Sequence, residues 1–290
     1  MCDEHTLSDA QAALAARGVT RRTFAAMGTA AVLAGMLPRP AGAQVGTLVQ
    51  SGAEFQTADG TVDAYFVYPA TGKHPAIILW PDIAGLRAAK EDLANRLAWE
   101  GYAVLAVNQY YRSAPAPVME NFSEWRTEEG RAKLQPMIPL LTPDAVMRDT
   151  RAFVAFLDQQ AGVDRSRGIG VHGYCMGGPF AVRSAAAAPE RIRAVASFHG
   201  GGLATDKPDS PHRLLAGTKA SYLIAVARND DLRNPQEKDT FRAAAAEAGR
   251  PAEIEVYNAD HGWCVPDSPV WDEAEADRAF ARLLALYSGL

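Results

Sequence analysis

Cys175 has the neighbours that a reactive thiol needs. Gly173 precedes it by two residues and Gly177 follows it by two, which is a nucleophile-elbow spacing with sulfur in place of a serine oxygen. Glycines at these positions let the backbone turn sharply and leave the nucleophile unobstructed. A helix predicted over about 177–188 would point its positive end at the sulfur and favour the thiolate. The same pattern is also typical of a buried structural cysteine at a strand end, so other residues must decide.

An acid and a histidine follow Cys175 along the chain. Asp230 comes just after a predicted strand over 220–227, and His261 just after one over 252–257. The order nucleophile, acid, histidine is that of α/β-hydrolases. In such a set the histidine takes the thiol proton, and the carboxylate fixes the orientation and tautomer of the histidine. Asp231 is the neighbouring alternative acid, and we expect it to cap the following turn.

The elements that must position these residues alternate between strands and helices. Strands are predicted at 74–80, 102–107, 168–174, 194–199, 220–227 and 252–257. Helices are predicted at 87–100, from 142 to 157, and at 177–188, 235–249 and 268–287, and an antiparallel hairpin at 45–70 precedes them. This alternation predicts the α/β-hydrolase fold, with a mostly parallel central sheet and helices on both faces. Ligands of such sheets bind beyond the carboxyl ends of the strands, where Cys175, Asp230 and His261 would meet.

Two further segments concern this edge of the sheet. His199 ends the predicted strand 194–199 and could line the pocket, but we expect it to be a hydrogen-bonded strand-end histidine. Residues 113–141 show no clean periodicity. A long irregular insertion at this place in a compact enzyme is more often a lid or a pocket wall than a linker.

Composition limits the class of protein. The chain has 290 residues, of which 48% are hydrophobic and 22% charged, as in an ordinary globular protein with a sizeable core. The net charge of −5 argues against a nucleic-acid partner and leaves a small molecule as the expected one. There is no Gly-x-Gly-x-x-Gly after a strand and no His/Cys cluster with metal spacing, so we expect neither cofactor nor metal.

The N-terminus has the pattern of a targeting segment. Arg21 and Arg22 precede a modestly apolar run over 25–37, and Ala-Gly-Ala follows at 41–43. This order predicts a twin-arginine export signal over 1–43, a hydrolase domain over 44–290, and a periplasmic or otherwise exported protein. The apolar run is short for a bilayer span, so no stable membrane anchor is expected after cleavage. The alternative is an amphipathic helix retained in the mature protein. Nothing in the sequence indicates the oligomeric state.

The remaining cysteines leave a rival function open. Export would place Cys175 and Cys264 in an oxidising compartment, where they could form one structural disulfide. In that case, or with Cys175 used as a reactive thiol, the chain would be a non-hydrolytic binding or redox protein on the same fold.

From about residue 64 to residue 290 the chain resembles the dienelactone hydrolase family, whose members have the α/β-hydrolase fold with a cysteine nucleophile. The resemblance rests on residues 173–178 (GYCMGG), 227–230 (ARND) and 257–263 (YNADHGW). It implies a hydrolase of the carboxymethylenebutenolidase type that cleaves an ester or lactone with Cys175, His261 and Asp230. A carboxylesterase of broad range is the alternative within the same fold.

The resemblance also implies supporting roles near the first of these loops. The backbone N–H groups of Ile83 and Met176 would form an oxyanion hole. Asp82 stands where the family usually has a glutamate that handles the proton of the resting thiol, and it is one methylene shorter.

Substrate-binding positions are implied as well. Tyr110 and Arg112 resemble the family's Tyr-x-Arg, in which the arginine pairs with a substrate carboxylate. Trp263 is expected in the core or in the pocket wall, where it could contact substrate. Val265 occupies the position of the family's second carboxylate-binding arginine, which argues against dienelactone itself as the substrate.

Overall fold

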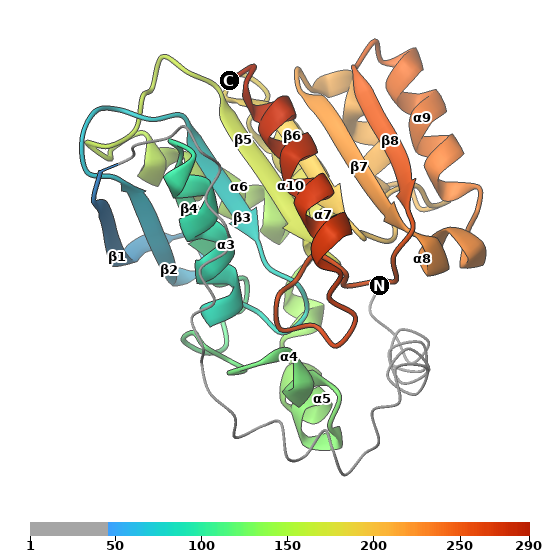
Figure 1. Cartoon of the computed structure of the whole chain (residues 1–290), viewed down its shortest axis with the longest axis horizontal. Coiled ribbons are helices and arrows are strands. Elements are labelled where there is room, and N and C mark those ends of the chain that lie inside the picture. Colours follow the sequence, from blue (N-terminus) through green and yellow to red (C-terminus); the bar gives the residue numbers. More distant parts are fainter. Residues whose placement is uncertain (1–45) are drawn as a thin grey trace.

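The strands of the described residues all belong to one central sheet. The computed structural model describes residues 46–290, so the expected export signal over 1–43 lies outside the described residues. Within them, eight strands form one sheet in the order β1-β2-β4-β3-β5-β6-β7-β8 (Figure 1). The strands are β1 (Leu48–Thr57), β2 (Gly60–Pro69), β3 (Ala76–Trp80), β4 (Ala103–Val107), β5 (Ile169–Tyr174), β6 (Ile192–Phe198), β7 (Ser221–Ala227) and β8 (Ala252–Tyr257). Strands β3 to β8 are parallel, whereas β1 and β2 pair antiparallel, as the sequence predicts.

Helices cover both faces of the sheet (Figure 1). The long helices are α3 (Ala88–Trp99), α6 (Pro143–Leu157), α7 (Gly177–Ala187), α9 (Glu237–Glu247) and α10 (Glu273–Tyr287). Side chains alternate across each strand, so Ile77 and Leu79 of β3 join a core with α3 and α10. Ile78 and Trp80 point the other way and join a core with α6, α7 and α9. Burial on both faces explains why the inner strands are apolar throughout.

Local signals explain where several elements begin. Thr142 caps α6 by accepting a hydrogen bond from the Ala145 N–H, and Pro143 occupies the first turn, as predicted. The C-terminal helix starts later than the expected residue 268, because Asp272 supplies its N-cap. β1 continues through Ser51 and Gly52, because it pairs with β2 along its whole length.

The irregular segment 113–141 is partly helical. It contains α4 (Phe122–Trp125), α5 (Glu128–Leu134) and a 3-10 turn, η1 (Ile138–Leu140). Figure 1 shows α4 and α5 beyond the edge of the sheet at which the parallel strands end. This is the edge that carries the predicted site residues, so the segment covers them. Two more short elements, η2 (Pro211–Gly217) and α8 (Arg228–Arg233), were not expected from the sequence.

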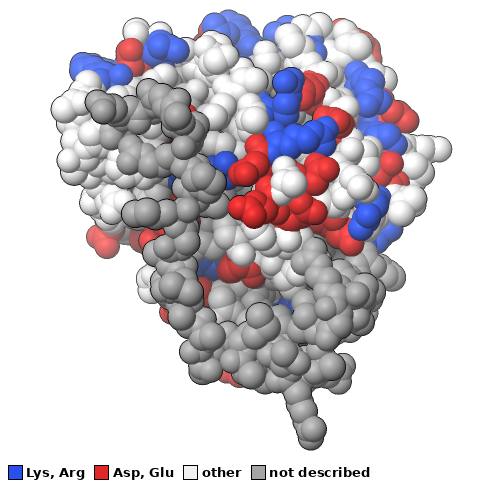
Figure 2. All heavy atoms as spheres, viewed as in Figure 1, with Lys and Arg blue, Asp and Glu red and all other residues white. Residues whose placement is uncertain are grey.

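The surface is charged in a mixed pattern. On the face shown in Figure 2, basic and acidic side chains alternate over α10 and β8, where Arg278 pairs with Glu255 and Arg282 with Glu253. Among the helices within residues 46–290, none is both long enough and apolar enough to cross a membrane.

Candidate active site

Cys175 occupies a tight turn between β5 and α7. Its φ of 54° lies in the left-handed region, which a non-glycine residue adopts only at a cost of about 1–3 kcal/mol. The glycines around it allow a close approach of backbone segments. A Cβ on Gly173 would lie 1.9 Å from the carbonyl oxygen of Gly177, and one on Gly178 would lie 2.3 Å from the Ser197 Oγ. The elbow therefore has the strained geometry of a nucleophile turn.

The acid and the histidine are in direct contact. The Nδ1 of His261 lies 2.6 Å from Oδ2 of Asp230, which belongs to α8 just after β7. The backbone N–H of His261 donates to Oδ1 of Asn229 at 2.9 Å, so two neighbouring residues of α8 hold the loop that contains His261. Asp231 instead pairs with Lys238 at 2.5 Å. Of the two neighbouring aspartates, Asp230 is therefore the one that orients the histidine.

His199 lies against this histidine. It follows β6, has a φ of 43°, and its ring centroid is 4.6 Å from that of His261. Neither of its ring nitrogens has a hydrogen-bond partner within the described residues, so the expectation of a hydrogen-bonded strand-end histidine is wrong. Burial, together with the neighbouring charge of His261, lowers the pKa of His199 well below its ordinary value. It therefore stays neutral and packs as a ring.

The loop after β3 is held from β4. Tyr110 is buried, and its hydroxyl donates to the carbonyl of Ile83 at 2.8 Å and contacts Met176 Sδ at 3.4 Å. Gln109 donates to the carbonyl of Asp82 at 2.7 Å. Within residues 46–290 no acceptor is found for the backbone N–H of Ile83 or Met176. Tyr110, expected to bind substrate, is thus a brace between these two residues.

An apolar cluster surrounds Cys175. It joins the elbow to the loop after β3 and to the segment that contains α4 and α5. Its buried members are Ile83, Ala84, Tyr110, Val118, Met119, Phe122, Trp125, Leu134 and Cys175. Residues of the segment 113–141, for which a lid or a pocket wall is predicted, consequently pack against Cys175. Within the described residues no cluster of three or more His, Cys, Asp or Glu side chains is arranged to hold a metal ion.

Comparison with known proteins shows the family of the chain. The model of the dienelactone hydrolase family matches residues 62–288. The chain belongs to the dienelactone hydrolase family. A carboxymethylenebutenolidase from Rhodococcus opacus is 28% identical over 195 residues, 67% of this chain and 71% of the relative. A protein of Methylorubrum extorquens, provisionally named a carboxymethylenebutenolidase, is 28% identical over 231 residues, 78% of this chain and 76% of the relative.

Solved structures identify the fold. A Klebsiella pneumoniae protein, provisionally named a dienelactone hydrolase, superposes with a TM-score of 0.72 at 21% identity, covering 84% of this chain and 100% of that one. A dienelactone hydrolase-like promiscuous phosphotriesterase from metagenomic libraries has a TM-score of 0.67 at 18% identity, covering 84% and 98%. The chain thus has the α/β-hydrolase fold of its family.

Cys175 and Cys264 do not form a disulfide with each other in this member of the dienelactone hydrolase family. Cys264 is a buried free thiol, and burial raises its pKa well above the ordinary value. It packs with Tyr174 in the core between the sheet, α3 and α10, whereas Cys175 belongs to the cluster at the edge of the sheet. Cys175 is itself disulfide-bonded in this structure. The rival hypothesis of a Cys175–Cys264 bond is therefore wrong, and any thiol chemistry requires reduced Cys175.

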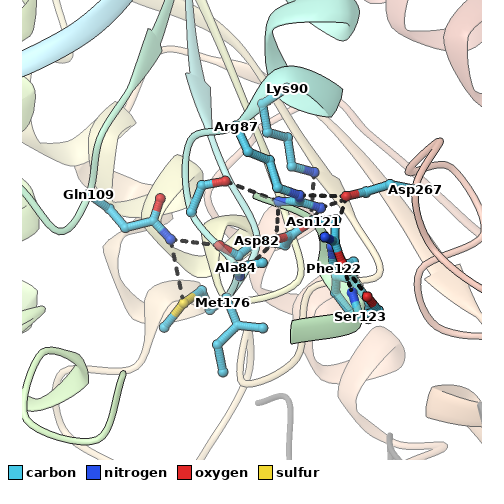
Figure 3. Close-up of polar contacts among 12 residues, drawn as sticks. Asp82, Ala84, Arg87, Lys90, Gln109, Asn121, Phe122, Ser123, Met176 and Asp267 are labelled. Carbon is cyan, nitrogen blue, oxygen red and sulfur yellow. Dashed lines mark hydrogen bonds and ion pairs between the residues drawn. The ribbon is translucent and has the colours of Figure 1, made fainter. Parts of the chain in front are cut away.

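Asp82 is buried within an ionic network. Its Oδ1 lies 2.9 Å from Arg87 and accepts from the Ala84 N–H at 2.9 Å, and its Oδ2 lies 2.8 Å from Lys90 (Figure 3). Burial by itself would raise the pKa of Asp82. The charges and hydrogen bonds of Arg87 and Lys90 outweigh this effect and hold the pKa well below its ordinary value. None of its contacts within the described residues is to the sulfur of Cys175, so the expected role as a thiol partner finds no support in them.

Arg112 is bound by two carboxylates of the protein itself. Its guanidinium lies 2.6 Å from Asp59, in the turn between β1 and β2, and 2.7 Å from Asp149 of α6. Its side chain is only 11% exposed. The geometry does not support the expected pairing with a substrate carboxylate, because this guanidinium fastens the hairpin to α6. The tertiary contacts that determine this were not visible in the sequence.

Trp263 and Val265, which follow His261 in the chain, are both buried. Trp263 stacks on Tyr257 with ring centroids 5.0 Å apart and meets His199 edge-on at 5.3 Å. It therefore packs against His199, and as a fully buried residue it is not a contact surface for substrate. Val265 brings no charge to this region.

Three charged residues of the network were missed by sequence reasoning. Arg87 and Lys90 are fully buried, and Asp267 is 23% exposed. One signal was available for Lys90, because it shares a helical face with Leu93 and Leu97, at the spacing of residues that turn toward a core. No local signal pairs Arg87 with Asp267, since they are separated by 180 positions.

Proposed function

We propose that this protein hydrolyses an ester or a lactone, with Cys175 as nucleophile, His261 as general base and Asp230 as the acid that orients it. The contact of 2.6 Å between His261 Nδ1 and Asp230 Oδ2 carries the proposal. It occurs at the same edge of the sheet as the strained turn of Cys175. The relatives named carboxymethylenebutenolidases support a lactone or ester as the bond that is cleaved.

The chemistry would proceed in two halves. In the first, His261 takes the proton of the reduced Cys175 thiol, and the sulfur attacks the carbonyl carbon of the substrate. The carbon–oxygen bond of the ester or lactone then breaks, and the protonated His261 gives its proton to the departing alkoxide. In the second, His261 deprotonates a water that attacks the thioester. The carbon–sulfur bond then breaks, the carboxylic acid leaves, and the proton on His261 returns to the sulfur to restore the thiol.

The negative charge on the carbonyl oxygen needs donors during both halves. The backbone N–H groups of Ile83 and Met176 are the proposed donors, since each lies in a segment that packs against Cys175. Tyr110 would hold the two segments at a constant separation through its hydroxyl contacts with both residues. The apolar wall from α4 and α5 would exclude bulk water and so strengthen these interactions.

The nucleophile is tested by a pair of cysteine variants assayed after reduction. Cys175→Ala should lower the turnover of a small activated ester by about 10³-fold or more, because removal of a nucleophile leaves only binding and oxyanion stabilisation. Cys264→Ala is the matched control and should keep turnover, since that thiol is free and lies in the other core. Full activity of Cys175→Ala would exclude Cys175 as the nucleophile.

A substrate panel distinguishes the two hydrolase functions. We expect five-membered unsaturated lactones to be turned over by reduced wild type and not by Cys175→Ala. Activity confined to short-chain esters, again lost in Cys175→Ala, would instead identify a carboxylesterase.

A further inference from the structure

A buried ionic network lies between three segments around Cys175. It contains two anions, Asp82 and Asp267, and two cations, Arg87 and Lys90. Charges buried in this way are costly to desolvate, so a balanced network is poor evidence of added stability and better evidence of a defined arrangement.

Arg87 is the centre of the network. Its Nη1 lies 2.9 Å from Asp82 and also donates to the carbonyl of Gly85 at 3.0 Å, both in the loop after β3. On its other side, its Nε and Nη2 each lie 2.7 Å from one carboxylate oxygen of Asp267, a bidentate contact (Figure 3). Asp267 belongs to the stretch that follows His261. One guanidinium therefore joins the loop of Ile83 to the segment of the histidine.

Asp267 extends the connection to the wall over Cys175. Its Oδ2 accepts a hydrogen bond from the backbone N–H of Phe122 at 2.9 Å, at the first residue of α4 (Figure 3). The Phe122 ring lies beside Arg87, whose guanidinium carbon is 5.8 Å from the ring centroid. Phe122 and Trp125 of the same short helix belong to the apolar cluster with Ile83 and Cys175. The position of α4 over the nucleophile thus depends on a carboxylate from a distant part of the chain.

We propose that Asp82, Arg87 and Asp267 form an ionic clamp that positions α4 over Cys175 and holds the loop of Ile83, so that Asp82 is a positioning residue and not a proton partner of the thiol. The catalytic consequence of this inference rests on the proposed function. The clamp itself does not, because the order of α4 can be measured without any activity.

The test compares Asp267→Asn with Asp277→Asn. Asp267→Asn keeps the size of the side chain and removes its charge, and Asp277 forms an exposed ion pair with Arg96, which makes it the matched control. In reduced protein, amide hydrogen exchange over 119–134 should rise by about tenfold or more in Asp267→Asn and stay at the wild-type rate in Asp277→Asn. Equal exchange in the two variants would overturn the clamp.

The steady-state parameters KM and kcat for a short-chain and a long-chain ester provide a second test. Because α4 supplies apolar surface, Asp267→Asn should raise KM for a long-chain ester by about tenfold and change kcat less. Loss of kcat with KM unchanged for both short and long esters would contradict a positioning role. If Cys175→Ala turns out to be fully active, the proposed function fails, whereas the exchange result still decides the clamp.

The pH dependence of Cys175 alkylation distinguishes the two possible roles of Asp82, which are positioning residue and proton partner of the thiol. In Asp82→Asn the midpoint of the iodoacetamide rate against pH should match that of wild type, while exchange over 119–134 should rise as in Asp267→Asn. A midpoint shifted by about one pH unit, with exchange unchanged, would restore Asp82 as the proton partner. Should Asp82→Asn not fold, Asp267→Asn carries the test, because its side chain is partly exposed.

Discussion

The imidazole of His261 is restrained from several directions by individual residues. Asp230 holds Nδ1, Asn229 holds the backbone N–H, and the ring of His199 packs at 4.6 Å. Arg233 lies 3.0 Å from the other oxygen of Asp230, so this carboxylate is fixed on both sides. A histidine restrained in this way presents Nε2 in one direction, as a base that serves a neighbouring nucleophile must.

Two adjacent aspartates make this arrangement testable. Asp230→Asn should lower kcat/KM by about 10²- to 10⁴-fold, because an amide at this position does not stabilise a protonated His261 or enforce its tautomer. Asp231→Asn should stay near wild type, since Asp231 pairs with Lys238 instead. Steady-state kinetics of both variants with one ester provide the comparison, and an equal loss in both would contradict the choice of Asp230.

At the scale of elements, the turn from β5 into α7 depends on how closely the backbone segments approach. Gly173 meets the carbonyl of Gly177, and a Cβ on Gly177 would lie 2.6 Å from the carbonyl oxygens of Trp80 and Pro81. The start of α7 is therefore packed directly on the end of β3. This contact brings Met176 and the loop of Ile83 to the same side of Cys175.

The contact at Gly173 leads to a prediction for stability and activity. Gly173→Ala should destabilise the fold by about 1–3 kcal/mol and reduce turnover strongly, because the new methyl displaces the first turn of α7. Gly217→Ala is the control, since no atom lies within 4 Å of the added Cβ. Urea unfolding and ester turnover of both variants measure the two effects. A Gly173→Ala protein with wild-type stability would refute the close approach.

At the scale of the whole molecule, the core contains two histidines that must remain neutral. His172 lies within β5, and its Nδ1 is 3.0 Å from the hydroxyl of Tyr287 on α10. Burial, with a smaller effect of Lys90, lowers the pKa of His172 to about 3. His199 shares this behaviour, as its pKa also lies well below the ordinary value. At the surface shown in Figure 2, by contrast, basic and acidic side chains are mixed, and Arg278 forms an ion pair with Glu255.

These histidines predict how stability depends on pH. The unfolded chain protonates them below about pH 6.5, whereas the folded protein keeps His172 neutral down to about pH 3. The unfolded state therefore binds more protons in this window, and the free energy of unfolding should fall as the pH is lowered, by about 1.4 kcal/mol per pH unit for each histidine. Urea unfolding at pH 7.5 and pH 5 measures the difference. His172→Gln should reduce the slope, and a pH-independent stability would contradict the prediction.

The sequence alone determined the alternation of strands and helices and the order of Cys175, Asp230 and His261 at strand ends. These features follow from local periodicity and from the rule that parallel strands end at one edge of the sheet. The elbow could also be predicted from the sequence, because its glycines are close to Cys175 in the chain. The positions of Ile83 and Met176 next to this elbow were inferred from family resemblance.

Only the tertiary structure decided the partners of the buried charges. Asp82 pairs with Arg87 and Lys90, Arg112 with Asp59 and Asp149, and Arg87 also with Asp267, 180 positions away. Which oppositely charged groups meet depends on how helices and loops pack around the sheet, and many pairings would satisfy the same local pattern. The same holds for Cys264, which lies only three residues after His261 but points into the opposite core. The number of residues between two positions does not predict these contacts, because the packing of helices and loops on the sheet determines which side chains are close in space.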